Sequence, residues 1–414
     1  MLKTDLKSIA TAALAEVHPA RAVQSALQEI TQKKSESEYY LIAIGKAAWP
    51  MARAAWRLLP KQIVAGFVLT KYQHAGGPLA DFQIWEAAHP VPDNNSRLAT
   101  SALLKFIQQI PAQGSVIFLL SGGGSALLEK PLPGLQLAEI RQITEKLLRQ
   151  AAPIQQINTL RKHLSAVKGG RLAQLIAPAQ IHALILSDVV GNRLDSIASG
   201  PVSPDPSTCA QAAEIVQKYQ LQLSTAAAQA LQIETPQQIS NVTTQVIGSV
   251  ETICQVAAEI AKNLGYQTQI VSTTVQGSQA DLLAEIVSTY HQVRNSSLEK
   301  PRAYIWGGET VLRVQGNGLG GRNQELALRL TPYLAEDPNA AFMALGTDGT
   351  DGPTDAAGGI IDGSSYQKLQ DAGCDLQKIL QANDSYHALQ KIGDLLKTGP
   401  TGTNLNDLNI LLLK

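Results

Sequence analysis

The stretch SVIFLLSGGGS, residues 115–125, indicates how this chain folds. An apolar run ends at Ser121, three glycines follow, and Ser125 opens an Ala-Leu-Leu stretch of helical character. Such a segment predicts a buried strand that passes into a helix through a glycine turn. Glycine permits positive φ in a tight turn, and bare backbone amides at the start of a helix can also bind an anion. Both interpretations are open from this stretch alone.

Short apolar runs alternate with helical patterns along the rest of the chain. The strand-like runs of the first half are residues 39–45, 64–70, 115–121 and 181–189, and those of the second half include 302–308, 309–314, 340–346 and 406–414. This alternation is typical of parallel βαβ units. We therefore predict an α/β protein of two Rossmann-like domains, each an open, mostly parallel sheet flanked by helices, with ligands bound in an interdomain cleft.

The domain boundary is placed by length and composition. A chain of 414 residues exceeds what one core usually organises. A less apolar zone, 221–241, separates the two alternating halves. We assign residues 1–235 to an N-terminal domain and 236–414 to a C-terminal domain, and leave open whether the final strand returns to the first domain. The first residues, MLKTDLKSIATAALAEV, predict an amphipathic helix rather than a signal peptide.

Composition narrows the class of partner. Lys plus Arg and Asp plus Glu both number 34, so the formal net charge is zero and nothing global favours nucleic acid or anionic lipid. No apolar stretch is long enough to span a bilayer. The three cysteines are far apart and form no C-x-x-C pair, which indicates a reducing compartment, and we expect the cytoplasm. A homodimer is compatible with the sequence.

Several candidate ligand-binding segments directly follow strand candidates, where ligands bind in this architecture. Lys46 follows the first strand and can neutralise an anion or remain in solvent. The glycine turn at 121–125 is either an anion nest or simply a tight turn. Residues 158–168 predict a helix that Gly169 and Gly170 would end, and its cations, Lys168 among them, have no acidic residue in the window 158–173. This face either meets an anion or is solvated.

Aspartates follow two other strand candidates. Asp188 ends one strand, and Asp348 and Asp351 occur among glycines in 346–359. A carboxylate at a strand end suits Mg²⁺, which takes few protein ligands and keeps several waters. The same residues also suit a helix cap or an Asx turn.

A second glycine turn lies in the C-terminal half. Residues 316–321 match the pattern G-x-G-x-x-G, which favours dinucleotide binding after a strand. The preceding residues 309–314 alternate polar and apolar, and Arg322 follows the turn directly, so a compact anion or a transferring phosphoryl group fits at least as well. The sequence has no G-x-x-x-x-G-K-[ST] motif, and it lacks the protein-kinase, α/β-hydrolase and zincin motifs.

Taken in order, these motifs resemble class II glycerate kinases, the glycerate 2-kinase family. The resemblance runs from about residue 40 to the C-terminus and includes AIGKAAW, LLSGGGSALL, INTLRKHLSAVKGGRLA, SDVVGNRLDSIASGPVSPDPST, GGRNQELAL and GTDGTDGPTDAAGGIID. It implies a two-domain α/β enzyme that transfers the γ-phosphoryl group of ATP to the 2-hydroxyl of D-glycerate, giving 2-phosphoglycerate. Family members have also been labelled hydroxypyruvate reductase, so the alternative is an NAD(P)H-dependent hydroxypyruvate reductase.

The resemblance also implies residue roles. The family's catalytic lysine matches Lys46 and its active-site arginine matches Arg322. With ATP and Mg²⁺ as cofactors, Asp188 and Asp348 would hold the metal, and Asp188 or Asp351 would accept the hydroxyl proton. The residues expected at the nucleotide are Ser121, Gly122, Gly123, Gly124, Ser125, Lys168, Gly320 and Gly321. The chain departs from the family in having Asn192 where an acidic residue is usual and Leu319 where lysine is frequent.

Overall fold

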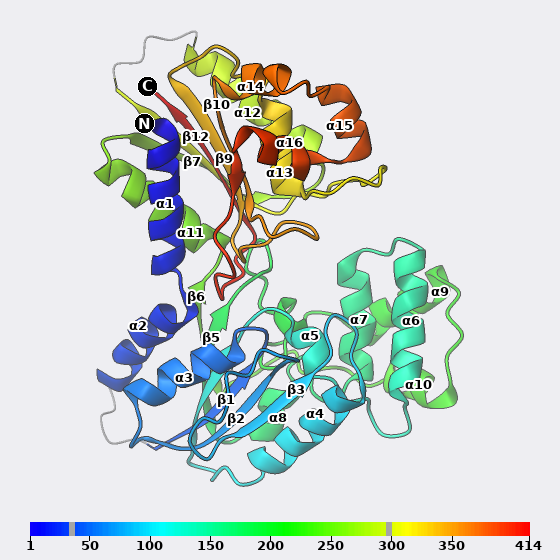
Figure 1. Cartoon of the computed structure of the whole chain (residues 1–414). Coiled ribbons are helices and arrows are strands. Elements are labelled where there is room, and N and C mark those ends of the chain that lie inside the picture. Colours follow the sequence, from blue (N-terminus) through cyan, green and yellow to red (C-terminus); the bar gives the residue numbers. More distant parts are fainter. Residues whose placement is uncertain (33–37, 295–299) are drawn as a thin grey trace. The chain divides into compact units, whose positions relative to one another are not determined.

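The computed structural model describes residues 1–32, 38–294 and 300–414, which divide into two compact units (Figure 1). One unit is Pro19–Ile247, and the other joins Met1–His18 to Gly248–Lys414. The sequence predicts a boundary at residue 236, with the first helix in the N-terminal domain. The structure instead divides the chain after Ile247 and assigns that helix, α1 (Leu2–Glu16), to the C-terminal unit.

The sheet of the Pro19–Ile247 unit has six strands in the order β3-β2-β1-β4-β5-β6. All pairings from β3 to β5 are parallel. The strands are β1 (Tyr39–Ile44), β2 (Ile63–Lys71), β3 (Gln83–Ala87), β4 (Ser115–Leu120), β5 (Gln180–Leu186) and β6 (Val242–Gly248). The continuous apolar runs of β1 and β4 suit strands that are covered on both faces. The strand order changes direction between β1 and β4, which is where open α/β sheets bind ligands.

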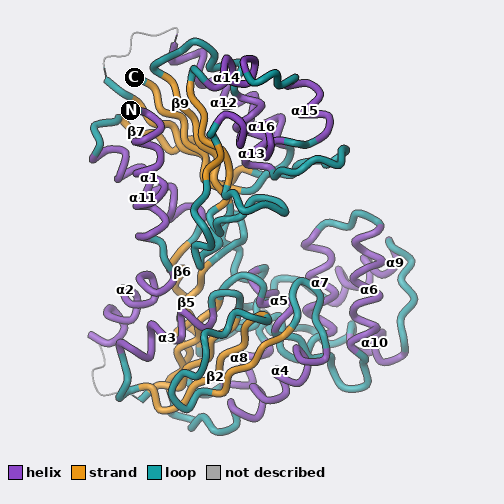
Figure 2. Tube along the Cα trace, viewed as in Figure 1, coloured by secondary structure: helices purple, strands orange, loops and turns teal. Residues whose placement is uncertain are grey.

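Helices cover both faces of this sheet (Figure 2). One face packs on α2 and α3 through residues such as Val23, Met51 and Leu119, and the other packs on α4 and α8 through Leu103 and Leu172. Helices α6, α7, α9 and α10 share a smaller apolar cluster of their own. The helices are α2 (Pro19–Gln32), α3 (Ala48–Leu58), α4 (Asn94–Ile107), α5 (Gly124–Leu127), α6 (Leu137–Arg149), α7 (Ile154–Leu164), α8 (Arg171–Ile176), α9 (Cys209–Lys218) and α10 (Thr225–Ala230), with a 3₁₀ turn η1 (Ile197–Ser199).

The second sheet is mixed, in the order β11-β10-β9-β12-β8-β7. Only β7 and β8 pair in parallel, whereas β12 runs antiparallel to both β8 and β9, and β10 is antiparallel to β9 and β11. The strands are β7 (Gln267–Val275), β8 (Arg302–Gly308), β9 (Ala340–Gly346), β10 (Gly358–Asp362), β11 (Leu395–Leu396) and β12 (Asp407–Leu413).

Two predictions for this half therefore need correction. The sheet is not mostly parallel, because β9 and β10 are joined by a polar loop with no helix and must run antiparallel. Residues 309–314 are not a strand, since only Val311 makes an isolated bridge, to Ser278. The final strand β12 lies at the centre of the second sheet and pairs with β8 and β9. The predicted α/β class with two sheets flanked by helices is confirmed.

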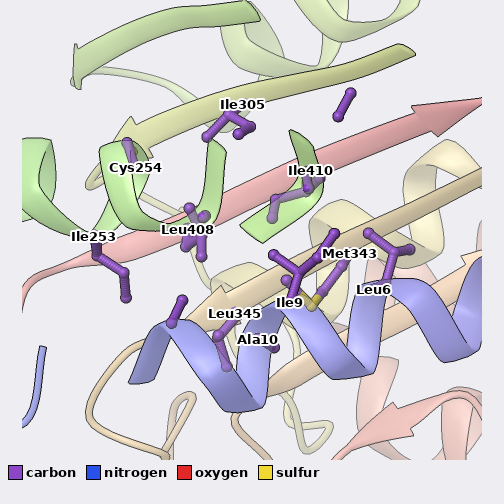
Figure 3. Close-up of a cluster of buried hydrophobic side chains, with 14 of the residues drawn as sticks. Leu6, Ile9, Ala10, Ile253, Cys254, Ile305, Met343, Leu345, Leu408 and Ile410 are labelled. Atoms are coloured by element: carbon purple, nitrogen blue, oxygen red, sulfur yellow. The ribbon is translucent and has the colours of Figure 1, made fainter. Parts of the chain in front are cut away.

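The N-terminal helix α1 completes the core of the second unit (Figure 3). Leu6, Ile9 and Ala10 of α1 point at the sheet beside Met343 of β9, and α11 shares the same apolar cluster. The opposite face is covered by α12, α13, α14 and α16. The helices of this unit are α11 (Val250–Asn263), α12 (Gln279–Arg294), α13 (Arg322–Leu330), α14 (Ser365–Asp371), α15 (Leu376–Ala382) and α16 (Ser385–Ile392). Across the described residues, the helices are too short or too polar to cross a bilayer.

Candidate active site

The turns after β1 and β4 are locked together by backbone hydrogen bonds. The Lys46 N–H donates to the Gly122 carbonyl at 2.9 Å, and the Ser121 hydroxyl accepts the Ala47 N–H at 3.0 Å. Gly45 has φ +126°, and a Cβ there would lie 2.4 Å from the Ser121 carbonyl oxygen. A residue with a side chain would force the two turns apart. The structure thus brings Lys46 and the predicted glycine turn together at the strand-order reversal.

Lys46 lies in a half-buried position beside His89. The position of a Cβ on Gly123 would be 3.1 Å from both the Lys46 side chain and the His89 ring. Burial lowers the pKa of His89 to about 4, and the nearby charge of Lys46 adds to the effect. None of the described carboxylates forms an ion pair with Lys46. Its ammonium is therefore not held by a carboxylate among the described residues.

Asp188 contacts the same glycine turn. It follows β5, and its Oδ2 atom would lie only 2.2 Å from a Cβ on Gly122. Gly122 is therefore required for the carboxylate to approach the turn. This places Asp188 next to the turn that contains the predicted phosphate-binding glycines.

The short helix α5 after the glycine turn is fixed by η1 and α7. The Ser125 and Ser199 hydroxyls are 2.5 Å apart, and Arg161 donates to the Ser125 carbonyl at 2.8 Å. Gly124 packs where a Cβ would lie 2.7 Å from the Cβ of Ala198, which itself has φ +51°. Ser125 is thus part of a rigid polar connection at the base of the turn.

The structure does not support the expectation that Lys168 contacts the nucleotide. Its side chain is fully buried, its ammonium lies 3.1 Å from Glu129 Oε2, and it also donates to the Leu128 carbonyl. Burial lowers the pKa of Lys168 to about 8. The helix α7 ends at Leu164, so Lys168 lies outside the predicted helical face. The cations of residues 158–173 find their acidic partners in distant segments of the chain. Lys162, for example, lies 2.6 Å from Asp205.

In the second unit, Arg322 is the first residue of α13 and is held by carboxylates. Its Nε and Nη2 atoms donate to Asp407 at 2.6 and 3.0 Å, and its Nη1 atom is 2.7 Å from Glu309. Burial disfavours its charge, but the hydrogen bonds and charge of Asp407, with Glu309, outweigh this and raise the pKa of Arg322. The Arg322 side chain stays about one-third exposed, at 32%. A forked guanidinium oriented in this way can still present N–H groups to an anion.

Asp351 caps α13 and is not an available base. Its carboxylate accepts the N–H groups of Asn323 and Gln324 at 3.1 and 2.8 Å, and both side-chain amides as well. Burial raises its pKa, and these hydrogen bonds oppose the rise. Gly321 is needed here because a Cβ would lie 2.3 Å from the Asp351 carboxyl carbon. Capping of α13 thus uses the acceptor capacity that Asp351 would need to act as a base.

The G-x-G-x-x-G turn packs against protein. The Asn383 side chain accepts the N–H groups of Gln315 and Gly316, and Asp384 accepts that of Leu319. A Cβ on Gly320 would lie 2.2 Å from the Ser385 hydroxyl. The N–H groups of Gln315, Gly316, Gly318 and Leu319 thus bond to the 382–385 segment, and the glycines allow this close packing. The turn follows a loop and not a strand, which removes its likeness to a dinucleotide-binding turn.

Asp348 forms an Asx turn, since its Oδ1 atom accepts the Thr350 N–H at 3.0 Å. Among the described residues, no three His, Cys, Asp or Glu side chains gather as metal ligands. Sequence reasoning missed Asp407, Glu309 and His89. Nothing in the local pattern distinguishes them, because each acquires its role from a residue distant in sequence.

Comparison with known proteins identifies the family. A family model described as "Domain of unknown function (DUF4147)" matches residues 5–232, and one described as "MOFRL family" matches 302–407. The D-glycerate 2-kinase of Thermotoga maritima is 48% identical, covering 96% of this chain and 95% of that protein. The glycerate 2-kinase of Pyrococcus horikoshii is 39% identical over 100% and 98%.

Two further proteins are similar to this chain. A putative hydroxypyruvate reductase of Agrobacterium vitis is 36% identical over 99% of this chain and 94% of its own length. The crystal structure of the Thermotoga maritima glycerate kinase superposes with a TM-score of 0.96 at 47% identity, covering 100% of this chain and 99% of that one. The chain belongs to the glycerate 2-kinase family.

Proposed function

We propose that this chain is an ATP-dependent kinase that phosphorylates the 2-hydroxyl of D-glycerate, giving 2-phosphoglycerate and ADP. The observation that carries the proposal is the 48% identity, over 96% of the chain, to a protein named D-glycerate 2-kinase. The position of Lys46 beside the glycine turn at 121–125 supports it. Phosphoryl transfer depends mainly on positioning and on neutralising phosphate charge, and this cluster offers both.

Lys46 is the residue we propose for stabilising the transferring phosphoryl group. Its ammonium has no carboxylate partner among the described residues, so a phosphate oxygen would not have to displace one. The neighbouring His89 is uncharged near neutral pH and does not compete for the anion. Gly122 makes room for the Asp188 carboxylate, and Gly123 makes room for Lys46 and His89, so these side chains gather at the turn that we propose binds phosphate.

Arg322 is proposed as the second cation on the transferring group. Asp407 orients its guanidinium through two hydrogen bonds, and the exposed Glu309 is the weaker partner that an anion can replace. We also propose that Gly320 and Gly321, which directly precede Arg322, lie at the nucleotide. Asp351 is not proposed as the base, because its carboxylate caps α13.

Mg²⁺ would neutralise the phosphate oxygens of ATP when bound. The residues present fit such an ion, because Mg²⁺ is usually held by one or two carboxylates together with substrate phosphates and waters. Asp188, half-buried beside Gly122, would be one ligand and is also the proposed acceptor of the hydroxyl proton. Asp348 remains the second proposed ligand, since its Asx turn uses only Oδ1. The cytoplasmic location and a homodimer also remain predictions.

The alternative, a hydroxypyruvate reductase, is favoured by the printed name of the Agrobacterium vitis relative. The geometry of the 316–321 turn counts against it, because the amides of Gly316 and Leu319 already have protein acceptors. Both activities can be measured on one preparation. We expect ADP release with D-glycerate and Mg-ATP, a ³¹P NMR spectrum of 2-phosphoglycerate, and no NADH oxidation with hydroxypyruvate. NADH oxidation without ADP release would overturn the proposal.

A further inference from the structure

A cavity of about 740 Å³ lies within the unit formed by Met1–His18 and Gly248–Lys414. One wall is α1, and the other is formed by the end of α16, β11 and residues 397–401. Its volume falls in the range of roughly 300–1,000 Å³ that is usual for small-molecule sites. None of the residues proposed above for phosphoryl transfer lines it.

The charged side chains of this cavity have one sign. Lys7 and Lys397 line it, and no carboxylate is among its described lining residues. Lys7 forms no ion pair with the described carboxylates, whereas Lys397 is 2.8 Å from Asp355, which lies outside the lining. Protein surfaces usually mix charges of both signs at this spacing. The cavity is therefore suited to an anion.

The floor of the cavity is apolar. Ala10 and Leu14 of α1 and Leu396 of β11 are buried residues that line it. The hydroxyl groups of Thr11 and Thr398 lie at exposed positions of the lining and can bond to a polar group. Pockets that combine an apolar floor with a few polar and charged groups bind organic molecules with one polar end.

We propose that this cavity binds a small organic anion, with its carboxylate, sulfonate or phosphate at Lys7 and Lys397 and its apolar body on Leu14 and Leu396. The inference rests on the lining residues and does not depend on the kinase activity. Lys7, Thr11 and Lys397 are exposed, so substitutions there test the site without disturbing the core.

The test uses 8-anilinonaphthalene-1-sulfonate, an anion with an aromatic body, in fluorescence titrations of the full chain. Saturating Mg-ADP and D-glycerate are present so that the substrate site is occupied. We expect one saturable site. Lys7→Glu combined with Lys397→Glu should weaken binding about tenfold or more, because each reversal replaces an attraction by a repulsion. Thr11→Trp should abolish binding by filling the cavity.

The matched control is Lys262→Glu on the exposed face of α11, which does not line the cavity and should bind the probe as the parent protein does. Uncharged N-phenyl-1-naphthylamine, a comparable aromatic body without the sulfonate, should bind more weakly to the parent. Circular dichroism and thermal unfolding verify that each variant is folded. Failure of the parent to bind the sulfonate would overturn the proposal, as would unchanged binding in the folded variants or equal affinity for the uncharged probe.

Discussion

Arg322 and Asp407 form a two-point ion pair, with Nε to Oδ2 at 2.6 Å and Nη2 to Oδ1 at 3.0 Å. Asp407 is buried, and its other described donor is the side chain of Asn323 at 3.0 Å. Arg322 consequently stabilises the fold through Asp407 and also has a proposed role in phosphoryl transfer. A double variant that changes both Arg322 and Asp407 can separate the effect on stability from the effect on turnover.

For Arg322→Ala we expect a loss of kcat of about a hundredfold or more, since one oriented transition-state cation is removed. We also expect about 2–4 kcal/mol of lost stability, because a buried carboxylate is left without its charge partner. The double variant Arg322→Ala/Asp407→Asn should regain most of the stability but none of the kcat. Urea unfolding and ADP release measure the two effects. Near-normal kcat in a folded Arg322→Ala protein would remove the role proposed for this residue.

Lys46→Met should behave differently. Because Lys46 has no ion-pair partner among the described residues, its loss strands no carboxylate and should change the free energy of unfolding by less than about 1 kcal/mol. We expect kcat to fall by about a hundredfold or more. The control is Lys61→Met, an exposed lysine before β2, which should keep full activity. Equal kcat in both variants would contradict the assignment.

Gly122→Ala tests the contact between Asp188 and the glycine turn. The added Cβ would lie 2.2 Å from Oδ2 and 2.8 Å from Cγ of Asp188 but 3.5 Å from its Cβ, so rotation of the Asp188 side chain about its Cα–Cβ bond relieves the clash. We expect a small change in melting temperature and a loss of activity of about tenfold or more, similar to that of Asp188→Ala. The double variant should be no worse than either single one. Additive losses would show that the two residues act separately.

Lys168→Met should act on stability. Of the charged partners that the structure describes, it leaves the fully buried Glu129 with Arg161 alone, at 3.7 Å, and should cost about 3 kcal/mol or more in urea unfolding. Adding Glu129→Gln should restore part of this loss because the buried charge is then removed. Activity per folded molecule should stay near normal in the double variant. If turnover instead collapses while stability is retained, Lys168 contacts the substrate after all.

His89 should make stability depend on pH. Its pKa is about 4 in the folded protein and about 6.5 in an unfolded chain, so between these values the unfolded state binds more protons. The stabilisation is present above pH 6.5 and is lost as the pH falls toward 4. Allowing for its partial exposure, we expect about 1–2 kcal/mol. The difference in unfolding free energy between parent and His89→Gln should shrink toward pH 4; a constant difference would contradict the burial effect.

The local patterns predicted those features that depend on neighbouring residues. The run 115–120 is buried on both sides of its strand, and the glycine turn that follows it meets Lys46 as expected for parallel strand ends. The family motifs predicted the kinase activity, and the roles of Lys46 and Arg322 remain predictions. The contacts around Lys46 lie within neighbouring βαβ units of the sheet.

The remaining features depend on segments far apart in sequence. The acid-free window around Lys168 looked like a ligand-binding face, but its partner Glu129 comes from a separate segment. The glycines of 316–321 match the pattern of a nucleotide-binding turn because close packing and phosphate binding both favour glycine. The contacts with residues 382–385 show that these glycines serve close packing. Asp407 could not be found because nothing local marks a strand residue that pairs with Arg322.

The central position of β12 and the docking of α1 on the same sheet constrain the order in which the protein can fold during translation. The Pro19–Ile247 unit is contiguous and can fold while translation continues. The other unit needs its first helix and its last strand together, so the apolar face of α1, with Leu6 and Ile9, waits for β12 to leave the ribosome. A nascent chain halted before Asp407 should therefore expose that face and recruit chaperones.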